Sequence, residues 1–244
     1  MIKKAIWLFC LLAAFVSWTS AQDMTLDEVL AKHFEAVGGL ENVKAIQSAK
    51  LTGKMSMGPG LEAPVVMLFK RPMKLRMEFT VQGMTGIQAY DGQTAWMVMP
   101  FMGKTEPEVM AEDQAKSVME QADFDGPLVD WKEKGHQVEL VGKEEVDGTE
   151  TYKIKTTLKN GDVRYQYMDT EYFLMIKQSG TANIQGNEVE MESTMSDYKE
   201  VGGLMLPHVL ESRRVGGPGG QSLVFDSIEL NVDIDDGLFS LPAK

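Results

Sequence analysis

The sequence predicts an α+β fold that is mainly antiparallel β, a strongly curved sheet or barrel of about eleven strands with helices on its concave side. Apolar residues spaced three and four apart occur near the N-terminus and again in mid-chain, which is typical of amphipathic helices. From about residue 48, most other segments alternate between apolar and polar residues, as half-buried strands do. Glycine-containing turns separate these segments, and no linker or internal repeat divides the chain.

The first 21 residues have the layout of a cleavable signal peptide. Lys3 and Lys4 precede an uncharged apolar run at residues 5–16, and small residues lead to a cleavage site after Ala21. The run is shorter than the roughly 20 residues that span a bilayer, which disfavours a membrane anchor. Cys10 lies inside the run and is removed with it, so lipid attachment there is not expected.

The mature chain, residues 22–244, is expected to be a single domain outside the cytoplasm. It has 223 residues, no cysteine and, without the two signal lysines, a net charge of −14. Because disulfides are excluded, its stability must come from core burial, and its length permits one sizeable core. The acidity argues against nucleic acid, whose phosphates select basic surfaces, and against adsorption to anionic membranes.

A first helix is expected directly after the signal peptide. Thr25 and Glu28 form a capping box, whose side chains satisfy the backbone N–H groups of a helix start. The apolar stripe that follows includes His33, which we interpret as a packed histidine rather than a ligand. Gly38-Gly39 ends this helix, and residues 40–46 predict a short second one.

The strands follow from about residue 48. In the clearest one, Met73, Leu75, Met77 and Phe79 alternate with charged or polar residues. Asp-Gly at 91–92 and Asn-Gly at 160–161 predict hairpin turns. The other strands are expected at residues 49–57, 64–70, 84–90, 94–99, 137–142, 150–158, 162–168, 173–181, 188–198, 208–215 and 221–232.

Residues 100–135 interrupt the strands with a helical pattern. Ala111, Ala115, Val118, Met119 and Ala122 have helical spacing, and residues 127–134 are expected to form a further short helix. An insertion of this kind is interpreted as a lid, in which Val118 and Met119 touch the cavity beneath it.

Catalytic and metal-binding motifs are missing from the sequence. His33, His136 and His208 are far apart and lack the spacing of metal ligands. There is no GxSxG serine motif, and the glycine-rich segment 216–220 lacks the lysine and helix of a phosphate loop. A hydrolase built from two acidic residues is the least favoured alternative, because nothing selects a pair. We therefore expect no enzyme activity, no cofactor and no metal.

Methionine is the unusual feature of the composition. Eighteen methionines occur, and eleven of them lie between Met55 and Met119. Unbranched and polarisable, methionine suits apolar surfaces that accept varied partners, although it also fills irregular cores. Because the methionines gather on consecutive strands beside the expected lid, we expect an apolar ligand cavity. Its wall is expected to contain Met73, Leu75, Met77, Phe79, Tyr90, Trp96, Val98 and Phe101, with Met97 and Met99 as the alternative on a strand that is apolar on both faces.

The order of several segments resembles a known family. The helix LDEVLAKHFEAVGGLENVKAI is followed by KRPMKLRMEF, YDGQTAWMVMP, a helical stretch, MDTEYFLMIKQ, GGLMLPH and DDGLFSLP. This order is similar to the LolA/LolB-like superfamily of periplasmic lipoprotein carriers, in the branch described as outer membrane lipoprotein-sorting proteins of Gram-negative bacteria. The resemblance covers nearly the whole mature chain. It implies an unclosed half-barrel of roughly eleven strands, helices over an apolar cavity, and an arginine that ties barrel to lid, for which Arg76 is the candidate.

The function implied by the resemblance is that of a periplasmic carrier. Such a protein binds the acyl chains of lipoproteins or lipids, acts as a monomer, and meets partner proteins at the inner and outer membranes. The alternative is an envelope interaction or stress-sensing protein whose helices dock a membrane-bound partner. In that case the apolar face is simply core.

Overall fold

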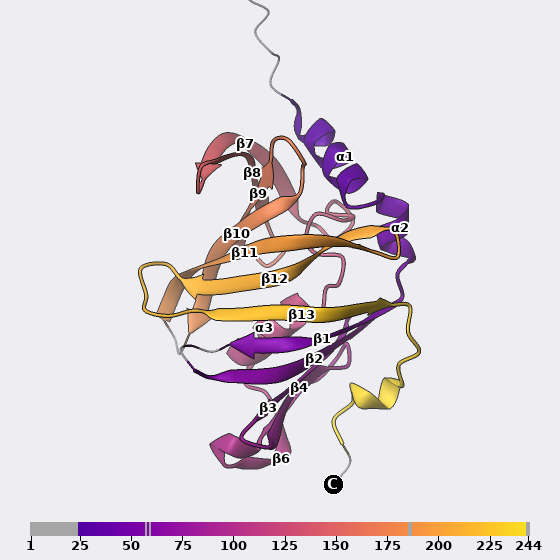
Figure 1. Ribbon diagram of the computed structural model, residues 1–244, viewed down its shortest axis with the longest axis vertical. Coiled ribbons are helices and arrows are strands. Elements are labelled where there is room, and N and C mark those ends of the chain that lie inside the picture. Colours follow the sequence, from indigo (N-terminus) through magenta and orange to yellow (C-terminus); the bar gives the residue numbers. More distant parts are fainter. Residues whose placement is uncertain (1–23, 57, 59, 185–186, 243–244) are drawn as a thin grey trace, which may run out of the picture.

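One antiparallel sheet dominates the chain (Figure 1). The computed structural model describes residues 24–242 apart from 57, 59, 185 and 186, so the expected signal peptide and its cleavage site lie outside the described residues. The helices are α1 (Leu26–Ala36), α2 (Leu40–Ala45) and α3 (Glu112–Gln121), with 3-10 turns η1 (Pro100–Met102) and η2 (Asp236–Leu238). The strands are β1 (Ser48–Ser56), β2 (Glu62–Lys70), β3 (Lys74–Val81), β4 (Met84–Tyr90), β5 (Ala95–Met99), β6 (Lys104–Val109), β7 (Gln137–Val146), β8 (Thr149–Thr157), β9 (Val163–Asp169), β10 (Met175–Ile184), β11 (Asn187–Val201), β12 (Leu204–Arg214) and β13 (Gln221–Leu230).

The strand order explains why the mid-chain segment lies across the sheet. The order is β6-β5-β4-β3-β2-β1-β13-β12-β11-β10-β9-β8-β7, so the chain starts in the middle and runs outward to one edge. It then has to reach the opposite edge before it returns to pair β13 with β1. Residues 110–136, which contain α3, connect the two edges. The sheet is therefore open, and the crossover segment lies across one of its faces and covers it.

The two faces of the sheet differ, and the register defines them. On β3, Leu75, Met77 and Phe79 are buried on one face, here called the inner face, while Arg76 and Glu78 lie on the opposite, outer face. The helix α3 contacts β3, β4 and β5 on the inner side and lies behind β13 and β1 in Figure 1. Burying each large apolar side chain stabilises the fold by about 1.5–3 kcal/mol, which fixes this register.

The N-terminal helix covers the other half of the inner face. Val29 and Leu30 of α1 pack with Tyr152, Ile154 and Met168 of β8 and β9. This group, with Leu128, is here called the α1 cluster. The expected capping box is confirmed: the Thr25 backbone N–H donates to Glu28 Oε2 at 2.8 Å, and the Glu28 N–H donates to Thr25 Oγ1 at 3.3 Å. Gly38 and Gly39 end α1 with positive φ angles, as predicted.

The mainly antiparallel α+β class is confirmed, whereas two details of the prediction are wrong. The described residues contain thirteen strands rather than about eleven: each of the twelve expected segments corresponds to a strand, and β6 adds one within the stretch expected to be helical. It is an edge strand that contains Lys104, Glu106, Glu108 and Pro107, so it has no apolar alternation for sequence reasoning to detect. Residues 127–134 form consecutive turns instead of a helix.

Candidate functional site

The candidate site is the apolar layer between α3 and the inner face of β1–β5 and β13, here called the methionine cluster. Period-two alternation places every second side chain of these strands in the layer, and the hairpins carry it from strand to strand. Its buried members are Met55, Val65, Met67, Leu75, Met77, Phe79, Tyr90, Ala95, Met97, Met99, Met110, Val118, Ala122 and Phe225.

Thioethers form much of this layer. Six of its buried members are methionines, and Met67 lies directly opposite Met77 in the β2–β3 ladder. Met77 is paired with Gln88 of β4, and Gln88 is paired with Met97 of β5, so Met67, Met77 and Met97 lie in one row across the sheet. A methionine side chain has three rotatable bonds and can adapt to different apolar shapes. This surface can therefore repack around a ligand more readily than one built from β-branched residues.

The cover over the methionine cluster is thin. Ala115 and Val118 of α3 and its C-cap residue Ala122 join the cluster, and none of these side chains is larger than valine. The N-cap of α3, Ala111, makes no side-chain hydrogen bond, and no basic residue lies in its last turn. A ten-residue helix without such terminal support is only marginally stable by itself.

Ion pairs at its edges hold this cover in place. Lys116 of α3 pairs with Asp162 at 2.6 Å, and Glu120 pairs with Arg164 of β9 at 2.8 Å. Burial alone would raise the pKa of Asp162, but the Lys116 and Arg164 cations nearby hold that pKa below its usual range. The contacts are polar and partly exposed, so they orient α3 without burying much additional apolar area.

The arginine that ties the sheet to the cover is Arg71 and not Arg76. From the β2–β3 turn, Arg71 binds the Asp125 carboxylate through both terminal nitrogens and donates to the Val43 carbonyl of α2 at 3.1 Å. The hydrogen bonds that Arg71 donates to the Asp125 carboxylate raise the pKa of Arg71. Arg76 points to the outer face, where it bonds Glu78 at 2.6 Å.

Six of the eight expected wall residues lie on the inner face, and two do not. Leu75, Met77, Phe79 and Tyr90 are buried in the methionine cluster, with Met73 and Phe101 packed partly buried against it. Trp96 and Val98 lie on the outer face. Trp96 Nε1 donates to the Phe239 carbonyl at 2.7 Å, because the C-terminal segment packs there.

The inward side chains of β5 are instead Ala95, Met97 and Met99. The register of the β4–β5 hairpin predicts these three residues. Tyr90 pairs with Ala95 across the Asp-Gly turn, so the odd-numbered residues of β5 share the face of Tyr90. On the expected lid, Val118 is buried in the cluster, but Met119 is 40 % exposed and points away from it.

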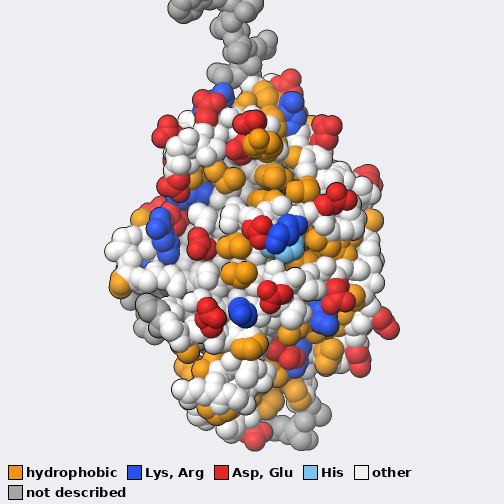
Figure 2. All heavy atoms as spheres, in the orientation of Figure 1, with side chains coloured by type: hydrophobic (Ala, Val, Ile, Leu, Met, Phe, Trp, Pro, Cys, Tyr) orange, Lys and Arg blue, Asp and Glu red, His pale blue; other side chains and the backbone are white. Residues whose placement is uncertain are grey.

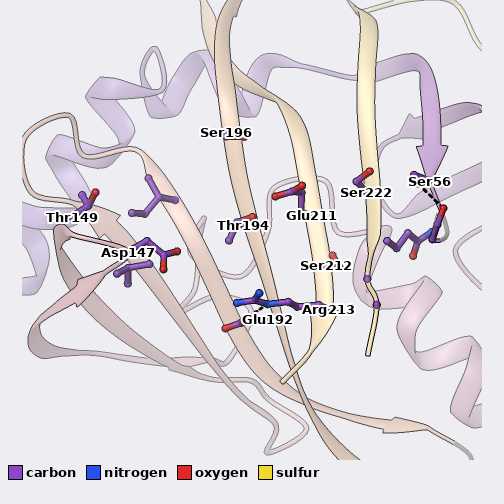
Figure 3. A pocket seen from close by; sticks show the side chains of 16 residues that line it. Ser56, Asp147, Thr149, Glu192, Thr194, Ser196, Glu211, Ser212, Arg213 and Ser222 are labelled. Carbon is purple, nitrogen blue, oxygen red and sulfur yellow. Dashed lines mark hydrogen bonds and ion pairs between the residues drawn. The ribbon is translucent and has the colours of Figure 1, made fainter. Parts of the chain in front are cut away.

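A broad hollow on the outer face has a different character (Figure 3). It has a volume of about 680 Å³ and is lined largely by hydroxyl and charged side chains, including Thr194, Glu211 and Ser222 on neighbouring strands. Glu192 bonds Lys177 and Arg213, each at 2.5 Å, and the hydrogen bond from Lys177 is the main reason that its pKa is lowered. Figure 2 shows acidic and basic side chains scattered among apolar ones on this side of the molecule. An acyl chain finds no continuous apolar lining there.

The histidines take structural positions. His33 is buried with Nδ1 2.8 Å from the Phe173 carbonyl, and burial lowers its pKa. His136 Nδ1 accepts from the Lys159 N–H at 3.1 Å, and His208 is buried within β12. Within the described ranges, no three His, Cys, Asp or Glu side chains are grouped as metal ligands. None of the helices seen in residues 24–242 is long and apolar enough to cross a membrane.

Comparisons with known proteins identify the fold. A family model described as "uncharacterized protein" matches residues 66–243, and a search of curated proteins found no matching sequence. Among solved structures, the chain is similar to a DUF1329 family protein from Desulfovibrio piger ATCC 29098, with 15 % identity, TM-score 0.61, and coverage of 87 % of this chain and 97 % of that one. It is also similar to a LolA superfamily protein from Nitrosomonas europaea, with 14 % identity, TM-score 0.60, and coverage of 89 % and 98 %.

A third similar structure is an outer membrane lipoprotein-sorting protein domain from Vibrio parahaemolyticus. The identity is 10 % and the TM-score 0.59, with coverage of 87 % of this chain and 94 % of that one. At such identities the likeness is one of fold. It confirms the resemblance that the segment order indicates.

Proposed function

The chain belongs to the family of uncharacterized proteins matched over residues 66–243 and has the fold of the LolA superfamily, and from this premise we propose that it binds acyl chains of lipids or lipoproteins. In this proposal it is exported by the signal peptide at residues 1–21, works in the periplasm of a Gram-negative bacterium, and consists of a single binding domain at residues 22–244. It acts as a carrier without catalysis.

The observation that carries the proposal is the thin cover over the methionine cluster. A methionine-lined face of six strands meets a ten-residue helix through only three small side chains. Moving α3 would therefore expose a large apolar surface while breaking little apolar packing of its own. The segment that moves is the crossover between two sheet edges, so the sheet does not have to unfold.

The energetics of chain burial support a lipid ligand. Burial of an acyl chain is worth about 0.8 kcal/mol per methylene, so one long chain supplies roughly 10 kcal/mol before ordering costs. This exceeds what is needed to displace Ala115, Val118 and Ala122 from the cluster. In the proposed complex the chain lies against Met73, Leu75, Met77, Phe79, Tyr90, Phe101 and the methionines of β5, with Val118 as the lid contact.

Two substitutions on one strand test this proposal. A fluorescent long-chain fatty acid is titrated into the mature protein, and native mass spectrometry of protein from its own host identifies co-purified acyl ligand. Met97→Glu puts a charge on the inner face and is expected to abolish probe binding, whereas Val98→Glu, on the outer face of the same strand, should retain it. Wild-type protein that binds no acyl probe and carries no acyl ligand would refute the proposal.

A second candidate function is docking on a membrane-bound partner protein without lipid transport. Exposed apolar side chains at the β6 edge favour it: Met102 is 69 % exposed and Val109 61 %. If docking is the function, Met102→Ser and Val109→Ser abolish capture of the partner from envelope extracts. Neither wild-type protein nor the variants then bind the acyl probe. If carriage is the function, wild-type protein binds the probe.

A further inference from the structure

Two buried polar atoms of the described residues have no hydrogen-bond partner: Oε1 of Glu120 and Nε2 of Gln166. Gln166 is only 1 % exposed. One atom is an acceptor on the cover helix α3, and the other is a donor on strand β9. Buried polar atoms are nearly always satisfied, because each lost hydrogen bond to water must be replaced. These two atoms therefore indicate a missing group.

Both atoms belong to one polar cluster. Thr156 Oγ1 donates to Gln166 Oε1 at 3.0 Å, and Thr156 lies opposite Arg164 in the β8–β9 ladder. Arg164 Nη2 in turn donates to Glu120 Oε2 at 2.8 Å. The cluster thus runs from Gln166 to Glu120, with one unpaired atom at each end.

This polar cluster lies at the junction of the two apolar clusters. Gln166 is paired across strands with Ile154 of the α1 cluster. At the other end, Glu120 is on α3, whose Val118 and Ala122 belong to the methionine cluster. A ligand with an acyl chain in the methionine cluster would bring its polar end to this junction.

A hollow of about 660 Å³ gives access to the cluster. Glu120 and Arg164 line it, together with other residues of α3, Asp162 before β9, Thr181 of β10 and Glu188 of β11. Gly180 provides the space that Arg164 needs, because a Cβ there would come within 2.6 Å of Arg164 Cδ. A head group of modest size can therefore approach the Glu120 end of the cluster from solvent, and Gln166 lies beyond it in the buried layer.

The charges at this hollow exclude an anionic head group. Arg164 already donates to Glu120 and to the carbonyls of Val163 and Thr181, and Lys116 is paired with Asp162. The remaining charged lining residues are the carboxylates Glu112, Asp113 and Glu188. A buried anion there would face like charges without a free counterion.

We propose that this cluster is a head-group site for a neutral, hydroxyl-bearing acyl lipid, of which a monoacylglycerol is the simplest example. One hydroxyl oxygen accepts from Gln166 Nε2, and a second hydroxyl donates to Glu120 Oε1. The acyl chain follows the methionine cluster. This inference rests on the proposed function, because a site for the head requires that the chain is bound.

The test is a competition experiment with ligands that share one C16 chain. Monopalmitoylglycerol and palmitate are titrated against a fluorescent acyl probe bound to the mature protein. We expect wild-type protein to prefer monopalmitoylglycerol by about tenfold or more, which corresponds to one or two additional hydrogen bonds. Gln166→Met, which keeps the volume and removes the donor, should bring the two affinities within about twofold. The surface control Gln93→Met should keep the wild-type preference.

A measurement on wild-type protein keeps the test decisive if Gln166→Met does not fold. In protein labelled with ¹⁵N-glutamine, a buried side-chain amide signal should shift on addition of monopalmitoylglycerol and stay in place with palmitate. If ligands bind without head-group preference and no amide signal moves, the inference is overturned and the two atoms are satisfied by an ordered water only. If neither ligand displaces the probe and the probe itself does not bind, the proposed function fails as well.

Discussion

The two halves of the inner face carry similar sheets under very different covers. Over β8 and β9, α1 contributes Val29, Leu30 and the buried His33, and its N-terminus is secured by a complete capping box. Over β3–β5, α3 contributes three small residues and has no side-chain cap. The first cover is built as permanent core, whereas the second has the properties of one that can be displaced.

Connectivity explains this difference. The helix α1 is a terminal element that docks from outside, so its sequence was free to acquire large apolar side chains and a strong cap. By contrast, α3 belongs to the crossover between β6 and β7 and is fastened at both ends by the sheet itself. It stays over the methionine cluster even with few apolar contacts of its own, because loop closure limits how far it can move. A tethered cover needs little intrinsic stability.

The largest effects are expected from placing a carboxylate under each cover. Met168→Asp, under α1, should unfold the protein or lower its free energy of unfolding by about 4 kcal/mol or more, because the site has no room to hydrate the charge. Met77→Asp, under α3, should cost less and abolish acyl-probe binding, because a displaced α3 lets water reach the carboxylate. Urea unfolding and probe titration measure both effects.

The control for the second variant is its neighbour on the other face of β3. Glu78→Gln should leave the free energy of unfolding and the affinity for the probe nearly unchanged, since Glu78 points outward. Equal losses from Met168→Asp and Met77→Asp would show that the two covers are equally permanent.

Smaller truncations sharpen the same comparison. Val29→Ala should lower the free energy of unfolding by about 2 kcal/mol, as expected for deletion of fully buried methyl groups. Val118→Ala should cost about 1 kcal/mol or less and speed probe uptake, because α3 can collapse onto the space left. Hydrogen exchange provides the local readout: amides at 111–122 should exchange faster than those of β3 and change on ligand addition. Uniform protection of both segments would contradict a displaceable cover.

Acid should act on the α1 side. Burial lowers the pKa of His33 from its ordinary value of 6.5, so the folded state favours the neutral ring. The contribution of the neutral His33 ring to the free energy of unfolding is fully present above pH 6.5. It is lost as the pH falls below 6.5, because the histidine of the unfolded chain is protonated before that of the folded chain. The urea midpoint of wild-type protein should therefore fall between pH 7.5 and 5.5. His33→Gln, which keeps an N–H for the Phe173 carbonyl, should show a smaller fall; the remainder includes His136, whose pKa burial and Lys134 also lower. An unchanged fall would assign the whole effect to other groups.

Local sequence signals predicted the covers and most of the sheet. The capping box of α1, the Gly38-Gly39 stop and the alternation of β3 depend on neighbours in sequence, and all were readable. The strand β6 was not, because an edge strand with charged side chains needs no apolar face. The turns at 127–134 have the apolar pattern of a short helix because their apolar residues pack against distant strands, as Leu128 does in the α1 cluster.

The residues of the inner face could be predicted on one strand and only partly on the next. A strand with one apolar face reveals its orientation, so Leu75, Met77 and Phe79 were found. The strand β5 is apolar on both faces because the C-terminal segment covers its outer side and contributes Phe239. That contact spans more than a hundred residues and has no local signature. The same long-range packing hid the role of Arg71, whose partner Asp125 is supplied by the crossover.

The smallest expected effects come from exchanging the helix caps of the two covers. Thr25→Ala removes the cap of α1 and should lower the free energy of unfolding by about 1 kcal/mol, without changing the rate of probe uptake. Ala111→Ser adds the cap that α3 lacks, at a residue whose φ of −63° and ψ of 153° lie in the extended region that N-caps adopt. If α3 must move before a ligand enters, the added cap should slow uptake about threefold, while equilibrium unfolding changes little. Stopped-flow fluorescence measures the rate. If Thr25→Ala changes the uptake rate and Ala111→Ser does not, ligands enter beneath α1, and the roles of the two covers are reversed.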